Sequence, residues 1–213
     1  MLYVVVAVAA YLVGGVPFGL LIGRLKGMDI RTQGSGNIGA TNVWRVLGRR
    51  WGITCFALDA LKGYLPVLVV ARCVEPAPEL LPITAAFATV AGHVWTPYLR
   101  FKGGKGIATS AGAVLGLAAG PLAIALVAWA ITFFTWRYVS LASIVAAVAL
   151  PFAAFGLNRL PSGPHYGLAT VVLLTLLALV AVGRHRSNLQ RLLQGTEHKM
   201  GKKESAHEDR RPQ

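Results

Sequence analysis

Long apolar segments are the feature of this sequence that most restricts how the chain can fold. Seven stretches are rich in apolar residues and poor in charge: 2–22, 52–73, 80–98, 107–120, 122–136, 139–157 and 165–183. A helix that crosses the hydrocarbon core of a bilayer needs about 20 such residues, and fewer for a short span. We therefore expect an all-α, polytopic integral membrane protein with about seven transmembrane helices.

The composition supports this fold class and excludes others. The chain is 55% hydrophobic and only 14% charged, whereas a soluble domain carries roughly a quarter charged residues. Its net charge of +13 does not indicate nucleic-acid binding, because long apolar runs separate the basic residues. Cys55 and Cys73 lack the spacing of metal ligands and are interpreted as small hydrophobic residues. Residues 1–10 have no basic start, which favours a retained first helix over a cleaved signal peptide.

The basic residues predict the orientation in the membrane. With seven crossings, all but three of the 21 lysines and arginines lie on one side; Arg72 and Arg159 lie opposite, and Lys62 lies within the second span. By the positive-inside rule the N-terminus faces outward and the C-terminus is cytoplasmic. A single helix over 107–136 would place the later basic clusters on the outer side of the membrane. We therefore expect a tight hairpin turn at 118–121. Residues 1–200 form one transmembrane domain, and 201–213 are expected to be a disordered basic and polar cytoplasmic tail.

A polar cluster lies between the first two apolar segments. Its candidate ligand-binding residues are Ser35, Gly36, Asn37, Gly39, Thr41, Asn42 and Arg45. Glycine amides can form an anion-binding nest, and a guanidinium group suits phosphate. The alternative is an ordinary polar loop that joins two helices.

A second cluster begins at His93 and ends in a glycine-rich run before the fourth span. The run contains Lys102, Gly103, Gly104, Lys105 and Gly106. Open amides, a lysine and a following helix N-terminus are typical of phosphate sites, although the pattern is not a Walker A motif. A plain turn would also explain the glycines, and His93 is expected to cap or pack at its helix end.

Two further polar clusters remain: one lies at the start of the sixth span, and the other follows the seventh span. Ser140 and Ser143 share one helix face and either cap the helix or donate to a phosphate. His185 and Asn188 point to one side of a continued last helix, with Glu197 shortly after them. His185 is suited to bind a phosphate or accept a proton, while a basic segment resting on anionic lipid is the alternative.

Some features within the spans have structural interpretations. Asp59 and Lys62 are three residues apart on one helix and can pair with each other, although charges inside a membrane are also functional candidates. Gly15, Gly19 and Gly23 repeat every fourth residue and predict a face for close helix packing. The four polar clusters fall on the same cytoplasmic side, which predicts one anion-binding site there.

Together these clusters resemble the bacterial acyl-phosphate:glycerol-3-phosphate acyltransferases, the PlsY family. The resemblance covers Ser-Gly-Asn-x-Gly-x-Thr-Asn…Arg from Ser35, Gly-His-x-Trp…Phe-x-Gly-Gly-Lys-Gly from Gly92, and His-x-x-Asn…Gly-x-Glu from His185. It implies a bacterial inner-membrane enzyme that moves an acyl group from acyl phosphate to the sn-1 hydroxyl of glycerol 3-phosphate. The products are lysophosphatidic acid and phosphate, in the first step of phospholipid synthesis. No metal, nucleotide or nucleic acid is implied, and a monomer is the simplest expectation.

The expected roles follow from two substrates that both carry phosphate. We expect Ser35, Arg45, His185 and Asn188 to be catalytic. The glycine amides, Asn37, Thr41, Asn42, Lys102, Lys105, Ser140 and Ser143 would bind substrate or phosphate, and His93 and Glu197 would support the site. The alternatives are a small transporter for an anionic metabolite, a non-catalytic membrane scaffold, and the same fold with acyl-CoA or acyl carrier protein as donor.

Overall fold

The computed structural model describes residues 1–74 and 78–201, and within these residues it contains helices and no β-strand. Of the expected tail, only Gly201 belongs to the described residues. The helices are α1 (Leu2–Gly15), α2 (Phe18–Leu25), η1 (Ile30–Thr32), α3 (Ala40–Leu47), α4 (Arg49–Cys73), α5 (Leu80–Val94), η2 (Pro97–Leu99), α6 (Ile107–Leu117), α7 (Ala119–Trp136), α8 (Val139–Leu157), α9 (Leu168–Arg184) and α10 (Arg186–Leu193).

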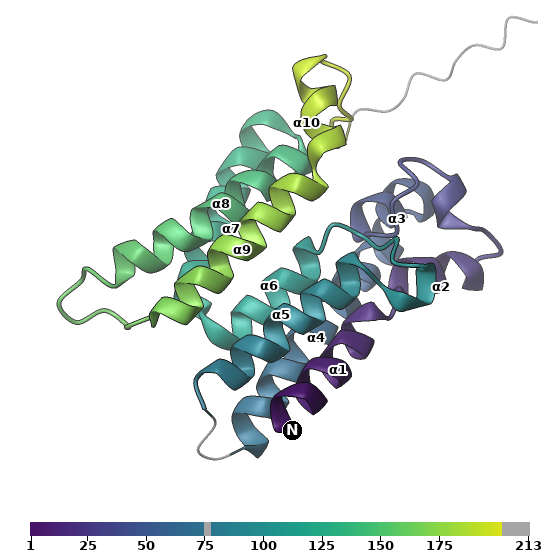
Figure 1. The fold of residues 1–213 in the computed structure, drawn as a ribbon. Helices are drawn as coiled ribbons and strands as arrows, with labels where there is room; N and C mark the ends of the chain where they lie inside the picture. The colour runs from purple at the N-terminus through teal and green to yellow at the C-terminus, as the bar shows by residue number, and fades with distance from the viewer. Residues whose placement is uncertain (75–77, 202–213) are drawn as a thin grey trace, which may run out of the picture.

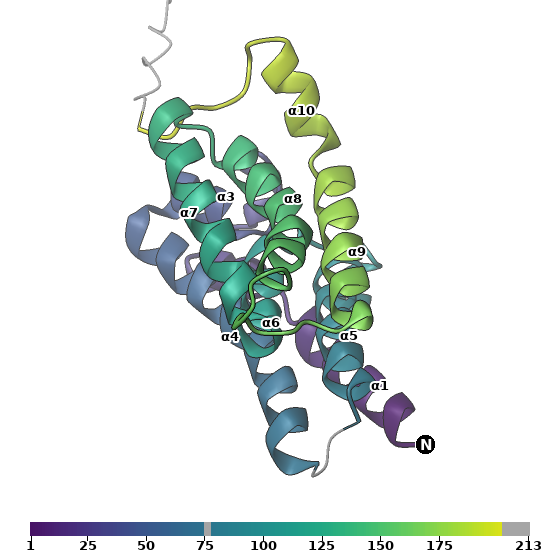
Figure 2. The same cartoon turned by 90° about the vertical axis from the view of Figure 1, so that its left-hand side faces the viewer.

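The long helices form two groups (Figures 1 and 2). In one group α1 packs along α5, and α4 packs along α6; in the other, α8 lies between α7 and α9. Alanine, valine and leucine side chains fill the core that joins the groups. The N-terminus lies at one end of the bundle, and α3 and α10 lie at the other (Figure 1).

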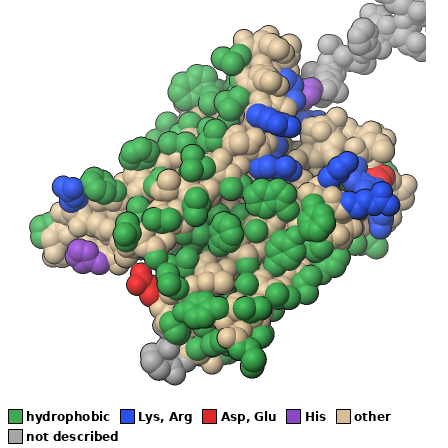
Figure 3. Space-filling model, viewed as in Figure 1, with side chains coloured by type: hydrophobic (Ala, Val, Ile, Leu, Met, Phe, Trp, Pro, Cys, Tyr) green, Lys and Arg blue, Asp and Glu red, His purple; other side chains and the backbone are tan. Residues whose placement is uncertain are grey.

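The surface of these helices is suited to lipid. Phe134, Phe152 and Leu168 are 70%, 71% and 80% exposed, respectively, and apolar side chains are spread over much of the helical surface in Figure 3. Most lysine and arginine side chains on that face lie toward the end with α3 and α10. A surface of this kind is stable in a bilayer, where exposed apolar groups avoid water.

Four segments among the described residues are long and apolar enough to span a membrane: Leu2–Leu25, Arg49–Cys73, Ala119–Trp136 and Val139–Leu157. A fifth is added if α9 and α10, which are bent by 56° relative to each other, are one span. Helix α6 is a shorter apolar helix. The chain is therefore an integral membrane protein by composition and length, and seven crossings remain a prediction.

The structure corrects three expected helix boundaries. The first apolar segment is not one helix but breaks at Val16 and Pro17, because proline cannot donate the next backbone hydrogen bond. The third ends at Val94 rather than at residue 98. The break between the fourth and fifth segments is confirmed, but it is confined to Ala118, and Pro121 lies in the first turn of α7. The backbone N–H groups in the first turn of a helix have no acceptor within the helix, so the missing N–H of Pro121 costs no hydrogen bond.

The glycine repeat near the N-terminus does not form one helix face. Gly15 ends α1, whereas Gly19 and Gly23 belong to α2. A methyl group at Gly19 would collide with the carbonyl oxygen of Ile38, so the glycine lets α2 approach the loop before α3. The expectation of helix–helix packing was wrong here, because the break redirects the second half of the segment.

Close helix packing occurs instead between α4 and α6. Gly63 lies against the backbone of Thr109, and Gly112 lies against the carbonyl of Ala60, so each helix supplies a glycine where the other approaches. Small residues allow helices in membranes to gain dispersion energy by such close approach. This contact fixes α6, which begins directly after the glycine-rich run.

We predict that Gly112→Ala lowers the thermal unfolding temperature in detergent, because its methyl group has no space beside Ala60. Overpacking of this kind costs about 1–3 kcal/mol. Gly156→Ala is the matched control, since Gly156 lies in α8 with no neighbouring atom within 4 Å of the added carbon. Equal unfolding temperatures for the two variants would contradict the prediction.

Candidate active site

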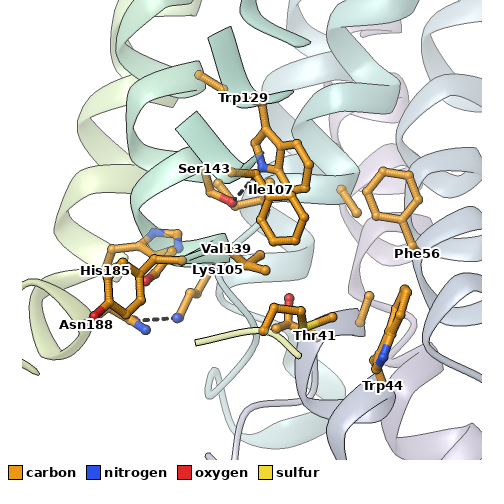
Figure 4. Close-up of a pocket in the computed structure, with 18 of the residues that line it drawn as sticks. Thr41, Trp44, Phe56, Lys105, Ile107, Trp129, Val139, Ser143, His185 and Asn188 are labelled. Atoms are coloured by element: carbon orange, nitrogen blue, oxygen red, sulfur yellow. Dashed lines mark hydrogen bonds between the residues drawn. The ribbon is translucent and has the colours of Figure 1, made fainter. Parts of the chain in front are cut away.

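A cavity of about 1580 Å³ lies between the two helix groups. Most candidate residues from all four clusters line it: Ser35, Asn37, Gly39, Thr41, Asn42, Arg45, His93, Lys105, Gly106, Ser140, Ser143, His185, Asn188 and Glu197. Gly36, Lys102, Gly103 and Gly104 are not among its lining residues. In Figure 4, Lys105, His185 and Asn188 lie together, with Thr41 of α3 across the cavity from them.

Hydrogen bonds between its own residues fix the shape of the loop before α3. The side-chain oxygen of Asn42 accepts a hydrogen bond from the Ser35 amide at 2.8 Å, and its nitrogen donates to the carbonyls of Ile30 and Gln33 at 3.1 and 3.0 Å. Asn37 accepts from the Gly39 amide at 2.8 Å. Asn42 is 2% exposed, so its side chain shapes the loop around Ser35 and Thr41. Sequence reasoning had assigned Asn42 to substrate binding and had not recognised this internal role.

The glycine-rich run is fixed by neighbours on two other helices. The amides of Gly103 and Gly104 donate to the carbonyls of Val94 and His93 at the end of α5, at 3.2 and 3.1 Å. Arg184 at the end of α9 donates to the carbonyls of Gly103 and Gly104 at 3.1 and 3.3 Å. Both glycine amides are thus used inside the protein, and the run serves to position Lys105 at the cavity.

A hydrogen-bond network connects Lys105 to the last described segment. Lys105 Nζ donates to Asn188 Oδ1 at 2.5 Å, and Asn188 Nδ2 donates to Glu197 Oε1 at 2.7 Å. Ser140 Oγ donates to the same carboxylate oxygen at 2.7 Å, and Arg191 Nε donates to Oε2 at 2.8 Å. Glu197 therefore holds together residues from α8 and α10. Ser140 does not cap its helix, contrary to one of the two expectations for it.

The charges in this network influence one another. Burial lowers the pKa of Lys105 to about 8; Glu197 opposes that effect, while Arg191, Arg45 and Arg184 add to it. Burial raises the pKa of Glu197, but hydrogen bonds from Ser140, Asn188 and Arg191 outweigh burial and leave the pKa below its usual value. Glu197 is therefore ionised at neutral pH, and Lys105 loses its proton more easily than an exposed lysine.

His185 lies at the bend between α9 and α10 rather than within a continuous helix. It is 3% exposed, and its Nδ1 lies 2.7 Å from the carbonyl oxygen of Ala181. Because a carbonyl can only accept, Nδ1 carries the proton and donates it. In the neutral ring Nε2 then keeps a lone pair, so it can accept a proton from a bound molecule.

The cavity also has an apolar part. Phe56 of α4, Ile107 of α6, and Trp129 and Phe133 of α7 line it. Trp129 Nε1 donates to Ser143 Oγ at 3.4 Å, so Ser143 lies where the polar and apolar parts meet (Figure 4). A molecule with an anionic group and a long hydrocarbon chain would find matching surroundings for both.

Sequence reasoning missed Arg184, Arg191 and Trp129 as parts of the site. The two arginines belong to the basic run around His185, which was interpreted as a group and not residue by residue. The sequence around Trp129 gives no indication of a functional role, because tryptophan residues within apolar spans commonly pack against other apolar side chains. Only the tertiary arrangement brings its indole to Ser143.

Comparisons with known proteins agree with this arrangement. The family described as glycerol-3-phosphate acyltransferase matches residues 4–195. The chain belongs to the glycerol-3-phosphate acyltransferase family. The member from Geotalea daltonii is 46% identical over 194 residues, which cover 91% of this chain and 95% of that protein. The member from Desulforudis audaxviator is 48% identical over 189 residues, covering 88% and 90%, respectively.

Two solved structures of the family have the same fold. One is an integral membrane glycerol 3-phosphate acyltransferase, PlsY, in its glycerol 3-phosphate form; it is 36% identical, covers 93% of this chain and 96% of that one, and has a TM-score of 0.85. The other is its lysophosphatidic acid form, with 35% identity, coverage of 93% and 95%, and a TM-score of 0.83. These matches make the chain an acyltransferase of phospholipid synthesis in the membrane.

We predict that kcat/KM for glycerol 3-phosphate falls above pH 8, because Lys105, with its pKa of about 8, loses the charge that attracts phosphate. If the neutral amine is inactive, the decrease is about tenfold for each further pH unit. Lys105→Arg keeps its charge in this range and should shift the decrease to higher pH. The measurement is the pH profile of both proteins, and coincident profiles would contradict this role of Lys105.

Proposed function

We propose that this protein transfers a fatty acyl group from acyl phosphate to the sn-1 hydroxyl of glycerol 3-phosphate, releasing lysophosphatidic acid and inorganic phosphate. The observation that carries the proposal is that one cavity has both a cationic end and an apolar part. Acyl phosphate needs both: a hydrocarbon surface for its chain and positive charge for its phosphate. Glycerol 3-phosphate needs the cationic end alone.

We further propose seven membrane crossings in the bacterial inner membrane, with the N-terminus outside and the active site facing the cytoplasm. Support comes from the distribution of the 21 lysines and arginines along the sequence and from the gathering of basic side chains at the α3 and α10 end (Figure 3). The acyl chain would enter from the bilayer between helices, and glycerol 3-phosphate would enter from the cytosol. The protein is proposed to act as a monomer.

The proposed reaction is one direct displacement. The glycerol oxygen attacks the carbonyl carbon of acyl phosphate, its O–H bond breaks, and the carbon–oxygen bond to phosphate breaks as the phosphate leaves with that electron pair. Nε2 of His185 is the preferred proton acceptor, because Nδ1 is engaged with Ala181. The substrate phosphate is the alternative acceptor. Phosphate is a good leaving group, so the scheme includes no covalent enzyme intermediate and no metal.

The remaining roles follow from position. The side chains of Ser35, Asn37 and Thr41 would hold one phosphate and the carbonyl oxygen as it becomes negative, because the amides of Ser35, Gly36 and Gly39 already donate within the loop. A donor of this kind typically contributes about 3 kcal/mol to transition-state stabilisation. Arg45, Lys105 and Ser143 would bind phosphate, and Asn188 would orient glycerol 3-phosphate beside His185. Ser140 donates its hydroxyl proton to Glu197, so it would support the site through that carboxylate instead of binding phosphate.

The donor assay tests the proposal. Purified protein in detergent is given glycerol 3-phosphate with either long-chain acyl phosphate, acyl-CoA or acylated acyl carrier protein. We expect 1-acyl lysophosphatidic acid only with acyl phosphate, together with one phosphate released for each product. Arg45→Ala, expected to be inactive while folded, gives the background. Transfer from acyl-CoA or acyl carrier protein, but not from acyl phosphate, would overturn the proposed donor.

We predict that His185→Ala lowers kcat by about 10²–10⁴-fold, the range typical of a lost general base. His165→Ala is the matched control, since His165 is exposed and does not line the cavity; its kcat should stay unchanged. Steady-state kinetics with both substrates varied separates turnover from affinity. An effect limited to KM for the acyl donor would remove His185 from the proton path.

A further inference from the structure

Three titratable side chains are buried together beside the site, and none has a role in the reaction proposed above. Asp59 and Lys62 of α4 form an ion pair of 2.7 Å, with 3% of each side chain exposed. His93 of α5 is 5% exposed, and its Nδ1 lies 3.7 Å from Asp59 Oδ1. The i,i+3 pairing expected for Asp59 and Lys62 is confirmed, but the pair is joined to a third residue.

One end of this cluster contacts the break between α1 and α2. Lys62 Nζ donates to the carbonyl oxygen of Val16 at 2.6 Å, directly before Pro17. Helix α2 starts after this break and carries Gly19, which lies against the Ile38 carbonyl in the loop of Ser35 and Thr41. The position of Lys62 therefore influences where that loop is held.

The other end contacts the glycine-rich run. A side-chain carbon at Gly104 would collide with Nε2 of His93, so the ring lies directly against that glycine. The carbonyl of His93 also accepts the Gly104 amide at 3.1 Å. Gly104 precedes Lys105, so the placement of His93 influences where the backbone of Lys105 lies.

The cluster is not arranged for stability alone. Within the described residues, His93 Nδ1 is buried without a hydrogen-bond partner, whereas Asp59 Oδ1 is compensated by its ion pair with Lys62. Unsatisfied buried polar atoms are rare in proteins and call for an explanation. A buried ion pair can also be replaced by apolar residues with little loss of stability. Both Asp59 and His93 line the cavity, which connects the arrangement with the site.

We propose that Asp59, Lys62 and His93 are positioning residues that set the distance between the loop around Ser35 and the glycine-rich run that carries Lys105. The inference rests on the proposed function, in which the two segments hold parts of one reacting pair. Without the cluster, each of these two segments keeps its own substrate-binding side chains, but the two segments are no longer aligned with each other. A misplacement of about 1 Å can reduce a rate by 10²-fold.

The test compares four cluster variants in detergent: Asp59→Asn, Lys62→Met, the double variant of both, and His93→Leu. The single changes on α4 leave one buried charge unpaired and should lower the unfolding temperature, whereas the double variant should recover it. We expect kcat of the folded double variant and of His93→Leu to fall about 100-fold, with KM for glycerol 3-phosphate changed less than about threefold.

Thr89→Val is the matched control, because Thr89 is fully buried on α5 one turn before His93 and donates only to Ala85 of its own helix at 2.7 Å. Its kcat should stay unchanged. The proposal is overturned if the folded double variant and His93→Leu have normal kcat, if only KM changes, or if none of the cluster variants folds. Lack of acyl transfer by the unaltered protein would instead count against the proposed function.

Discussion

The carboxylate of Glu197 is the interaction on which the polar end of this bundle depends. Arg45, Lys105, Arg184 and Arg191 bring positive charge to the end of a largely apolar helical assembly, where the low local dielectric strengthens repulsion. Glu197 accepts hydrogen bonds from Ser140, Asn188 and Arg191, and Asn188 in turn accepts from Lys105. One acid thus ties α8, α10 and the glycine-rich run together.

This balance also leaves the cavity with an excess of positive charge. Glu197 compensates only part of the surrounding positive charge, so the cavity retains an attraction for a further anion. The same burial that lowers the pKa of Lys105 removes competing water and strengthens a contact with phosphate. The bond from His185 to Ala181 leaves one ring nitrogen available as a proton acceptor. In the proposed reaction, stability and chemistry at this end would therefore use the same charged groups.

In the proposed reaction, the division into two helix groups would let a water-soluble and a lipid-like substrate meet. Glycines at the contact of α4 with α6 bring these helices close together, while α7, α8 and α9 pack on one another. The space left between the groups is lined by aromatic and aliphatic side chains at one part and by the basic network at another. If the proposed donor is correct, the hydration energies of its acyl chain and its phosphate would place the chain in the apolar part and the phosphate at the basic network.

The sequence by itself determined the helical fold class, the polar clusters that line the cavity and the pairing of Asp59 with Lys62, because apolar runs, motif chemistry and i,i+3 spacing are local properties. Only the tertiary structure decided the bend at His185, the use of Asn42 inside its own loop and the contact of His93 with Gly104. The hydrogen bond from Ser140 to Glu197 was likewise decided by the tertiary structure. Each depends on which distant backbone carbonyl, amide or side chain lies opposite, and that is set by helix packing across the whole chain rather than by neighbouring residues.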